Sequence, residues 1–227
     1  MYQLIIGNKN YSSWSLRPWV LMQELGIAHS EQLLRFGHAP SWDNLRKLSP
    51  SGRVPCLIDG GNAVWDSLAI CEYLAERHAG VWPTDSAARA FARCAAAEMH
   101  SGFMALRNSC SMSCGVRVQL KEFPDALRDD IARIGQLFDD GLRRFGGPFL
   151  GGAGFSAVDA FFAPVAFRVQ TYDLSLNEAG TAYVHRMLNL PSMRRWYAAA
   201  LAEDFRDDPH EQFMLAGGNV LKDFRQS

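Results

Sequence analysis

The spacing of hydrophobic and polar positions changes about a third of the way along the chain. Over the first 80 residues, short apolar runs alternate with segments of helical periodicity. The runs predict strands at residues 2–7, 31–36, 55–59 and 62–65, and the periodic segments predict helices at 15–26, 41–48 and 66–78. A strand–helix–strand unit followed by a hairpin and a helix predicts an α/β layer built on a mixed four-stranded sheet.

The pattern beyond a breaker-rich stretch at residues 79–85 is different, because strand signals disappear there. Apolar residues at helical spacing predict helices at 86–110, at 123–145, from Ser156 through Phe167, and after Pro191. The change predicts two domains, a mixed α/β domain at 1–80 and an all-helical domain at 86–227.

Ser156 and Asp159 mark the start of one of these helices. A hydroxyl at the cap and a carboxylate three residues later can accept the N–H groups that a helix start leaves unpaired. We therefore expect a capping box here and assign the pair a structural role.

Composition excludes several classes of function. With 48% hydrophobic residues and a net charge of −1, the chain gives no reason to expect a nucleic acid or an anionic membrane as partner. No apolar run approaches the ~20 residues that span a bilayer. The five cysteines are scattered and odd in number, so we expect neither a disulfide framework nor a metal site, and we expect a reducing cytoplasm.

The strongest chemical signal is the pair Asp66-Ser67, placed where a predicted helix starts after the hairpin. Free N–H groups and the positive end of the helix dipole suit a carboxylate. The Asp66 carboxylate suits an ammonium group beside it. The pair is therefore suited to the α-amino acid end of a peptide.

The order of these features resembles the cytosolic glutathione S-transferases, whose N-terminal domain is thioredoxin-like. The shared features are a strand opened by Val54-Pro55, the acidic residue–serine pair, the linker, and an all-helical domain with a Ser-x-x-Asp box. The run Ser12–Arg17 is similar to serine-type members, the zeta and theta groups. The run Glu98–Phe103 is similar to a bacterial subgroup of such proteins. The resemblance implies a cytoplasmic, homodimeric transferase of detoxification that uses glutathione as co-substrate on a small electrophile, without a metal.

The resemblance also implies roles for residues of the first domain. Pro55 would follow a cis peptide bond, and the Val54 backbone would pair with the cysteinyl part of glutathione. Asp66 and Ser67 would bind the γ-glutamyl end. Arg53 either pairs with a carboxylate of glutathione or is a solvated loop arginine.

Another aromatic residue of the first domain has two possible roles. Trp42 either lines the glycine end of glutathione or packs against neighbouring side chains.

The choice among three early serines depends on Pro18. Because proline belongs in the first turn of a helix, Ser15 is expected as the N-cap, which leaves Ser12 and Ser13 on the preceding loop. The family pattern places the active hydroxyl four residues before an arginine, here Arg17, and this favours Ser13. Ser12 and Ser15 stay alternatives, as does a purely structural role for all three.

The chemistry itself needs a glutathione thiolate. A hydroxyl that donates to the sulfur, together with a nearby helix N-terminus, favours the charged form. Tyr11 is a rival donor, since some family members use tyrosine. No cysteine stands among residues 11–18, which argues against a thiol–disulfide reductase.

A second-substrate pocket is expected along the helix predicted at 86–110. His100, Phe103, Met104 and Arg107 are spaced to share one helical face. That face suits a substrate with an apolar body and an anionic end, or else an interface between domains or subunits.

Two other functions are compatible with the same residues. One is a maleylacetoacetate isomerase, in which glutathione adds to and leaves a cis-enoyl diacid, with Arg17 or Arg107 as cationic anchor. The other is a non-catalytic glutathione-binding or regulatory module, since fold alone does not fix function.

Overall fold

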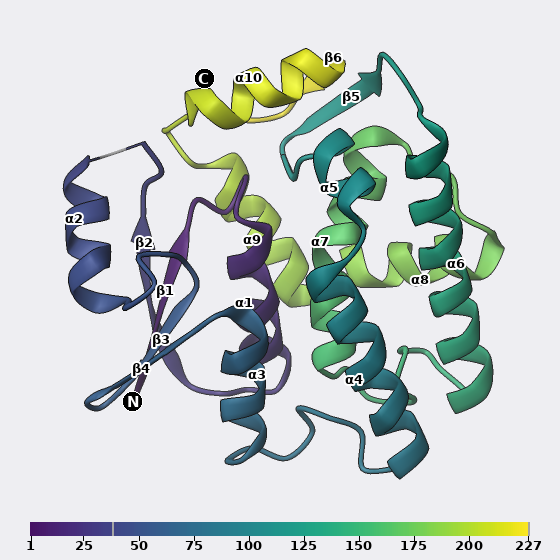
Figure 1. Ribbon diagram of the computed structural model, residues 1–227, viewed down its shortest axis with the longest axis horizontal. Coiled ribbons are helices and arrows are strands. Elements are labelled where there is room, and N and C mark those ends of the chain that lie inside the picture. The colour runs from purple at the N-terminus through teal and green to yellow at the C-terminus, as the bar shows by residue number, and fades with distance from the viewer. Residues whose placement is uncertain (38, 227) are drawn as a thin grey trace.

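The computed structural model describes the backbone of residues 1–37 and 39–226 (Figure 1). The side chains of residues 39–42 and 44 lie outside the described part. Trp42 is among them, so its role stays a prediction.

The first part of the chain forms one mixed sheet. Its strands are β1 (Tyr2–Gly7), β2 (His29–Leu34), β3 (Cys56–Asp59) and β4 (Asn62–Trp65). They are ordered β2-β1-β3-β4, with β1 and β2 parallel and the other neighbours antiparallel. The predicted mixed sheet is confirmed, although β2 begins and ends two residues earlier than the pattern at 31–36 predicts.

Helices cover both faces of this sheet. Helices α1 (Ser13–Glu24) and α3 (Ser67–Ala75) lie between the sheet and the helical half, and α2 (Ala39–Leu48) lies on the other side (Figure 1). Because neighbouring strand residues point to opposite faces, Leu4 and Ile6 enter the main core while Ile5 enters the small cluster under α2. This explains why β1 is an apolar run rather than an alternating one.

The second part of the chain is mainly helical, as predicted. It contains α4 (Ser86–Ser101), α5 (Met104–Ser109), α6 (Asp125–Phe145), α7 (Ala157–Tyr172), α8 (Glu178–Leu188), α9 (Pro191–Leu201) and α10 (Asp208–Gly217). Helix α7 is buried along almost its whole length and packs against α1, α4 and α8. The exact domain boundary stays a prediction.

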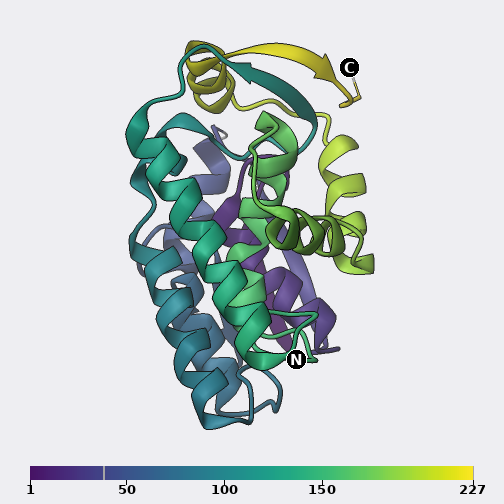
Figure 2. The same cartoon turned by 90° about the vertical axis from the view of Figure 1, so that its right-hand side faces the viewer.

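A two-stranded ribbon that the sequence did not predict joins the end of the chain to its middle. Strand β5 (Val116–Leu120) pairs with β6 (Gly218–Asp223) in antiparallel register. Figure 2 shows this ribbon beside α10 at one end of the molecule. The ribbon therefore positions α10 against elements that lie about a hundred residues earlier in the chain.

The helix predicted at 86–110 is wrong in its continuity, because α4 ends at Ser101 and α5 begins at Met104. Phe103 between them has a φ of 57°, in the left-handed region. A Cβ at Gly102 would lie 2.9 Å from the Glu98 carbonyl oxygen, so the chain approaches its own helix end too closely for a side chain.

The predicted capping box at the start of α7 is confirmed. Asp159 accepts hydrogen bonds from the N–H groups of Leu150 and Ser156, from the Ser156 hydroxyl and from the Tyr183 hydroxyl. Burial raises the pKa of this carboxyl to about 6 against the opposing effect of these donors. Asp159 therefore connects the α7 start to α8 and to the preceding loop.

We expect Asp159→Ala to lower the free energy of unfolding by about 3 kcal/mol, because buried donors lose their acceptor. Asp159→Asn keeps one acceptor oxygen and should lose less. Denaturant unfolding of the three proteins measures this. Equal losses in both variants, or a loss below about 1 kcal/mol in the alanine variant, would contradict the assigned role.

Candidate functional site

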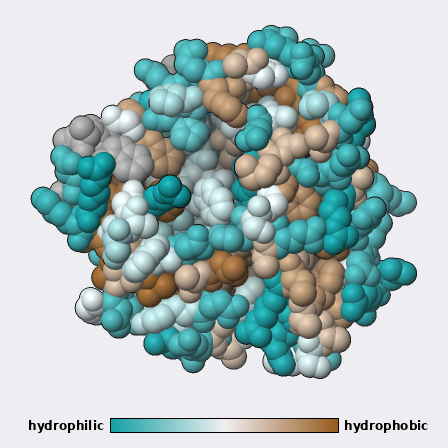
Figure 3. Space-filling model, in the orientation of Figure 1, coloured by the Kyte–Doolittle hydropathy of each residue, from teal (hydrophilic) through white to brown (hydrophobic). Residues whose placement is uncertain are grey.

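Two adjoining cavities lie where the sheet half meets the helical half, and Figure 3 shows a hollow near the middle of this face. The larger has a volume of about 520 Å³ and the smaller about 500 Å³. They share Trp14, Arg53 and Val54 as lining residues. Because the walls are common, a ligand in one cavity can contact a ligand in the other.

The loop that precedes α1 is bonded to the helical half. The Trp196 indole N–H donates to the Lys9 carbonyl at 2.8 Å. The N–H groups of Lys9 and Asn10 both donate to the Glu203 carboxylate. These bonds fix where α1 begins relative to the larger cavity.

The start of α1 differs from the prediction. Ser12 is the N-cap and Ser13 the first helical residue, so the assignment of the cap to Ser15 is wrong. The Ser15 hydroxyl oxygen instead accepts from the Ser12 hydroxyl (2.7 Å) and from the Gly7 N–H (3.1 Å), and Pro18 is tolerated inside the helix. Tertiary bonds to the end of β1 thus override the preference of proline for a first turn.

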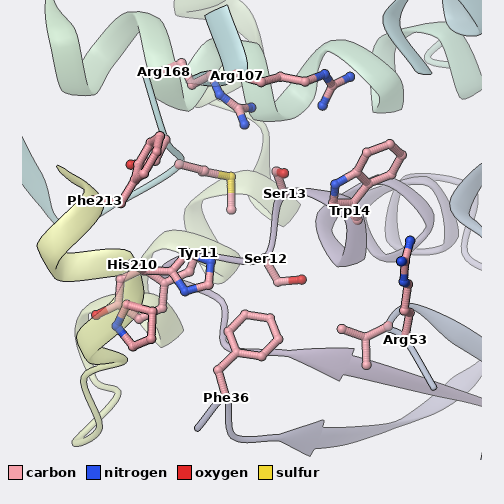
Figure 4. Close-up of a pocket in the computed structure, with 14 residues that line it drawn as sticks. Tyr11, Ser12, Ser13, Trp14, Phe36, Arg53, Arg107, Arg168, His210 and Phe213 are labelled. Atoms are coloured by element: carbon pink, nitrogen blue, oxygen red, sulfur yellow. The ribbon is translucent and has the colours of Figure 1, made fainter. Parts of the chain in front are cut away.

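Ser13 and Ser12 both line the larger cavity, but only one of these hydroxyl protons is free. The Ser12 hydroxyl is committed to Ser15. The Ser13 hydroxyl has no hydrogen-bond partner among the described residues, and it lies in the cavity, below Arg107 and Arg168 in Figure 4. Ser13 is therefore the available donor at the helix start.

The phenol of Tyr11 is occupied by a different contact. It donates to Glu211 on α10 at 2.7 Å, and the same carboxylate pairs with Arg225. Burial and the Glu211 carboxylate raise the pKa of Tyr11 well above its usual value. These contacts argue against Tyr11 as a free donor and give it a role in positioning α10.

Asp66 lies at the predicted helix start, where it is the N-cap of α3 with an unusual φ of 74°. Oδ1 accepts from the Leu68 N–H at 2.8 Å, and Oδ2 lies 3.6 Å from His100 Nε2. Burial lowers the pKa of His100 below its usual 6.5, so this imidazole is neutral at pH 7. The Asp66 charge is therefore not neutralised by His100 and faces the smaller cavity.

Ser67 lies next to a buried cation. Arg17 Nη1 donates to Ser67 Oγ at 3.2 Å, and the guanidinium lies over the rings of Trp14 (4.2 Å) and Phe161 (4.7 Å). Burial, together with other nearby guanidinium groups, lowers the pKa of Arg17 well below its usual value. Because Ser67 Oγ accepts from a cation, its own proton is left to donate into the smaller cavity.

Val54, Pro55 and Arg53 line the wall of the smaller cavity. The Val54–Pro55 peptide bond is cis. The N–H and carbonyl of Val54 have no hydrogen-bond partner among the described groups. The Arg53 side chain is exposed. Together these residues offer an unpaired stretch of backbone and a cation.

The four residues expected to form one second-substrate face are divided by the break between α4 and α5. His100 lies on α4, at the end nearer the smaller cavity, and contacts Trp14. Phe103 is buried, and Met104 is 56% exposed. The prediction of one shared face is therefore wrong. Of the four residues, Arg107 alone lines the larger cavity.

Several residues of the larger cavity carried no recognisable signal in the sequence. His210 on α10 stacks on Tyr11 and on Phe36, with ring centroids 5.1 and 5.3 Å apart, and its Nδ1 pairs with Asp207. The cavity is also lined by Ser111, Met112, Arg168, Pro209 and Phe213. They come from segments that only the long-range ribbon and the packing of α7 bring together.

Neither a metal centre nor a membrane span emerges from the described residues. No group of three or more His, Cys, Asp or Glu side chains among them could bind a metal ion. Within the same part of the chain, no helix is both long and apolar enough to cross a membrane.

Comparison with known proteins gives matches in both halves of the chain. Residues 11–77 match the family described as "Glutathione S-transferase, N-terminal domain". Residues 117–199 match the family described as "Glutathione S-transferase, C-terminal domain". Together the two matches cover most of the chain and both sides of the site.

Individual relatives are more distant. A "Stringent starvation protein A homolog" from Pasteurella multocida is 23% identical over 197 residues, covering 83% of this chain and 87% of that protein. A "Probable maleylacetoacetate isomerase" from Caenorhabditis elegans is 32% identical over 98 residues, which is 42% of this chain and 45% of that protein. A glutathione transferase homolog from Burkholderia, solved with bound glutathione, aligns with a TM-score of 0.66 at 22% identity, covering 88% of this chain and 97% of that one.

The electrostatics around Asp66 can be measured directly. We expect the pKa of His100 to lie below 6.5, and Asp66→Asn to lower it further, because the carboxylate opposes the effect of burial. NMR titration of the imidazole measures both, with exposed Asp129→Asn as the charge-matched control. A wild-type value above 6.5, or a rise in the Asp66 variant, would contradict this geometry.

Proposed function

Because the chain belongs to the glutathione S-transferase family, we propose that it binds glutathione in the smaller cavity and activates its thiol against a small electrophile in the larger one. The observation that carries this proposal is the placement of two chemically distinct groups. Asp66 and Ser67 line the smaller cavity, and Ser13 lines the larger, with Trp14 and Val54 common to both. A tripeptide can therefore extend from one to the other.

The γ-glutamyl end of glutathione carries both an ammonium and a carboxylate. In this proposal the ammonium binds the Asp66 carboxylate, and the carboxylate accepts from the Ser67 hydroxyl at the start of α3. The cysteinyl backbone pairs with the free N–H and carbonyl of Val54 beside Pro55. Arg53 pairs with a carboxylate of the ligand.

The reaction needs the thiolate, because a free thiol of this kind has a pKa near ~8.5 and is mostly protonated at neutral pH. The Ser13 hydroxyl donates to the sulfur, and the start of α1 adds positive potential. The thiol proton leaves to solvent. The sulfur then forms a bond to the electrophilic carbon, and either a leaving group departs with its electron pair or the carbon framework accepts the charge.

A second reaction is favoured by one observation. Arg107 and Arg168 both line the larger cavity, and two cations suit the diacid of a maleylacetoacetate isomerase. The C. elegans relative carries that name, over less than half of this chain. In that reaction, the glutathione thiolate adds to one carbon of the double bond, whose electron pair moves onto the conjugated carbonyl. The resulting single bond rotates, and the double bond re-forms as the thiolate leaves.

A non-catalytic module is the alternative from another class of function. Glutathione binding without turnover of any electrophile would favour this module.

We expect the enzyme to be a homodimer located in the cytoplasm. Gel filtration coupled to light scattering measures the oligomeric state.

We expect Asp66→Asn to weaken glutathione binding about ten-fold or more, since it removes the charge opposite the ammonium. The variant keeps an acceptor for the Leu68 N–H, so the α3 cap is preserved. Titration calorimetry measures the affinity, with Asp129→Asn as control. Unchanged affinity in the Asp66 variant would place the ammonium elsewhere.

We expect Ser13→Ala to raise the pKa of the bound glutathione thiol by about one unit and to lower turnover at neutral pH, while glutathione still binds. Ultraviolet titration of the thiolate in the complex measures this pKa. Ser12→Ala is the matched comparison, because that hydroxyl already donates to Ser15. A pKa raised by the Ser12 change and not by the Ser13 change would reverse the assignment.

A further inference from the structure

Two arginines lie on the helical side of the larger cavity, across from Phe36 (Figure 4). Arg168 on α7 is only 4% exposed, and its Nε donates to the Cys110 carbonyl at 2.7 Å. Its Nη1 donates to the Pro164 carbonyl at 3.4 Å, which leaves Nη2 without a described partner. Arg168 is therefore a rigidly positioned cation with an unused donor.

Arg107 on α5 is the second of these cations. Its Nε donates to the Gly102 carbonyl at 3.0 Å, and Nη2 donates to the Met99 carbonyl. Its guanidinium carbon lies 5.1 Å from the centre of the Trp14 ring. Neither Arg107 nor Arg168 forms an ion pair with any described carboxylate.

The environment of the pair is unfavourable for positive charge in the absence of a ligand. Burial, and then the neighbouring Arg107, lowers the pKa of Arg168 to about 10. Burial also lowers the pKa of Arg107, partly offset by Asp130. Desolvated cations are costly unless an anion pairs with them, so the cavity has a strong preference for negative charge.

The same cavity also has apolar, flat walls. Phe36, Met112 and Phe213 contribute apolar surface, and the ring of His210 is stacked against Phe36. Planar faces of this kind suit a planar apolar body. The proposed function pairs the two carboxylates of glutathione with Ser67 and Arg53, which line the other cavity, so neither carboxylate accounts for Arg168.

We propose that the electrophile of this enzyme carries a carboxylate or a similar oxyanion on a flat apolar body, and that Arg107 and Arg168 bind that anionic group. This inference rests on the proposed function for the identity of the thiol that attacks. Arg168 fixes the anion through its free Nη2, and Ser13, to which the proposed function assigns the thiolate, lies below the two arginines in Figure 4. Guanidinium groups form charge-assisted hydrogen bonds with such planar anions.

The test compares two related electrophiles, 1-chloro-2,4-dinitrobenzene and 4-chloro-3,5-dinitrobenzoate, of which only the second carries a carboxylate. Each kcat/KM is divided by the uncatalysed rate with glutathione at the same pH. We expect the ratio to favour the carboxylate about ten-fold or more, and to fall about ten-fold in Arg107→Gln and Arg168→Gln. Arg143→Gln removes the same charge from an exposed side chain on α6 and should leave the ratio within about two-fold of the wild-type value.

Two results would overturn the proposal. One is a ratio in the wild type that favours the neutral compound. The other is that the arginine changes lower the affinity for glutathione, or raise the pKa of its thiol, enough to account for their whole effect on the ratio. These cations would then bind glutathione and not the electrophile. If circular dichroism shows that Arg168→Gln does not fold, Arg168→Lys, which keeps the charge, is used in its place.

A binding measurement separates this inference from the proposed function. Benzoate and benzamide are titrated calorimetrically into the protein without glutathione. We expect benzoate to bind at least ten-fold more tightly and to lose this advantage in Arg107→Gln. Equal affinity for the two compounds overturns the anion site even if glutathione turns over. Selective benzoate binding supports the anion site even if glutathione fails to bind and the proposed function falls.

Discussion

The attachment of the β1–α1 loop to the helical half is the constraint on which the site depends. The N–H groups of Cys114 and Gly115 donate to the carbonyl and the side-chain oxygen of Asn10, at 3.2 and 3.0 Å. The Trp196 indole and the Glu203 carboxylate bond to the same loop. Buried polar groups of this kind are costly to leave unpaired, so the two halves pack in one arrangement. The start of α1 is thereby placed opposite helices that come much later in the chain.

The charges around the site are divided between the two cavities. Asp66 supplies negative charge at the smaller one, where the neutral His100 does not neutralise it. Arg107 and Arg168 supply positive charge at the larger one. A ligand with an ammonium at one end and a reactive sulfur at the other is thus oriented by electrostatics as well as by shape. The same division is consistent with the proposal that the electrophile, which meets the sulfur in the larger cavity, carries an anionic group.

Features with a local cause were predictable from the sequence, and features with a long-range cause were not. The sheet, the cap at Asp66 and the box at Ser156 follow from apolar runs and from polar residues at helix starts. The cap at Ser15 was wrong, because a bond to Gly7 decides how Ser15 is used. The β5–β6 ribbon has short strands with weak patterns, so the cavity residues of α10 could not be placed before the structure was known.

The most direct test of the central claim is a crystal structure of the protein with glutathione bound. The account predicts the ammonium against the Asp66 carboxylate, the cysteinyl backbone paired with Val54, and the sulfur within hydrogen-bonding distance of Ser13 Oγ, facing the larger cavity. Glutathione bound with its ammonium away from Asp66, or with its sulfur out of reach of Ser13, would contradict the account.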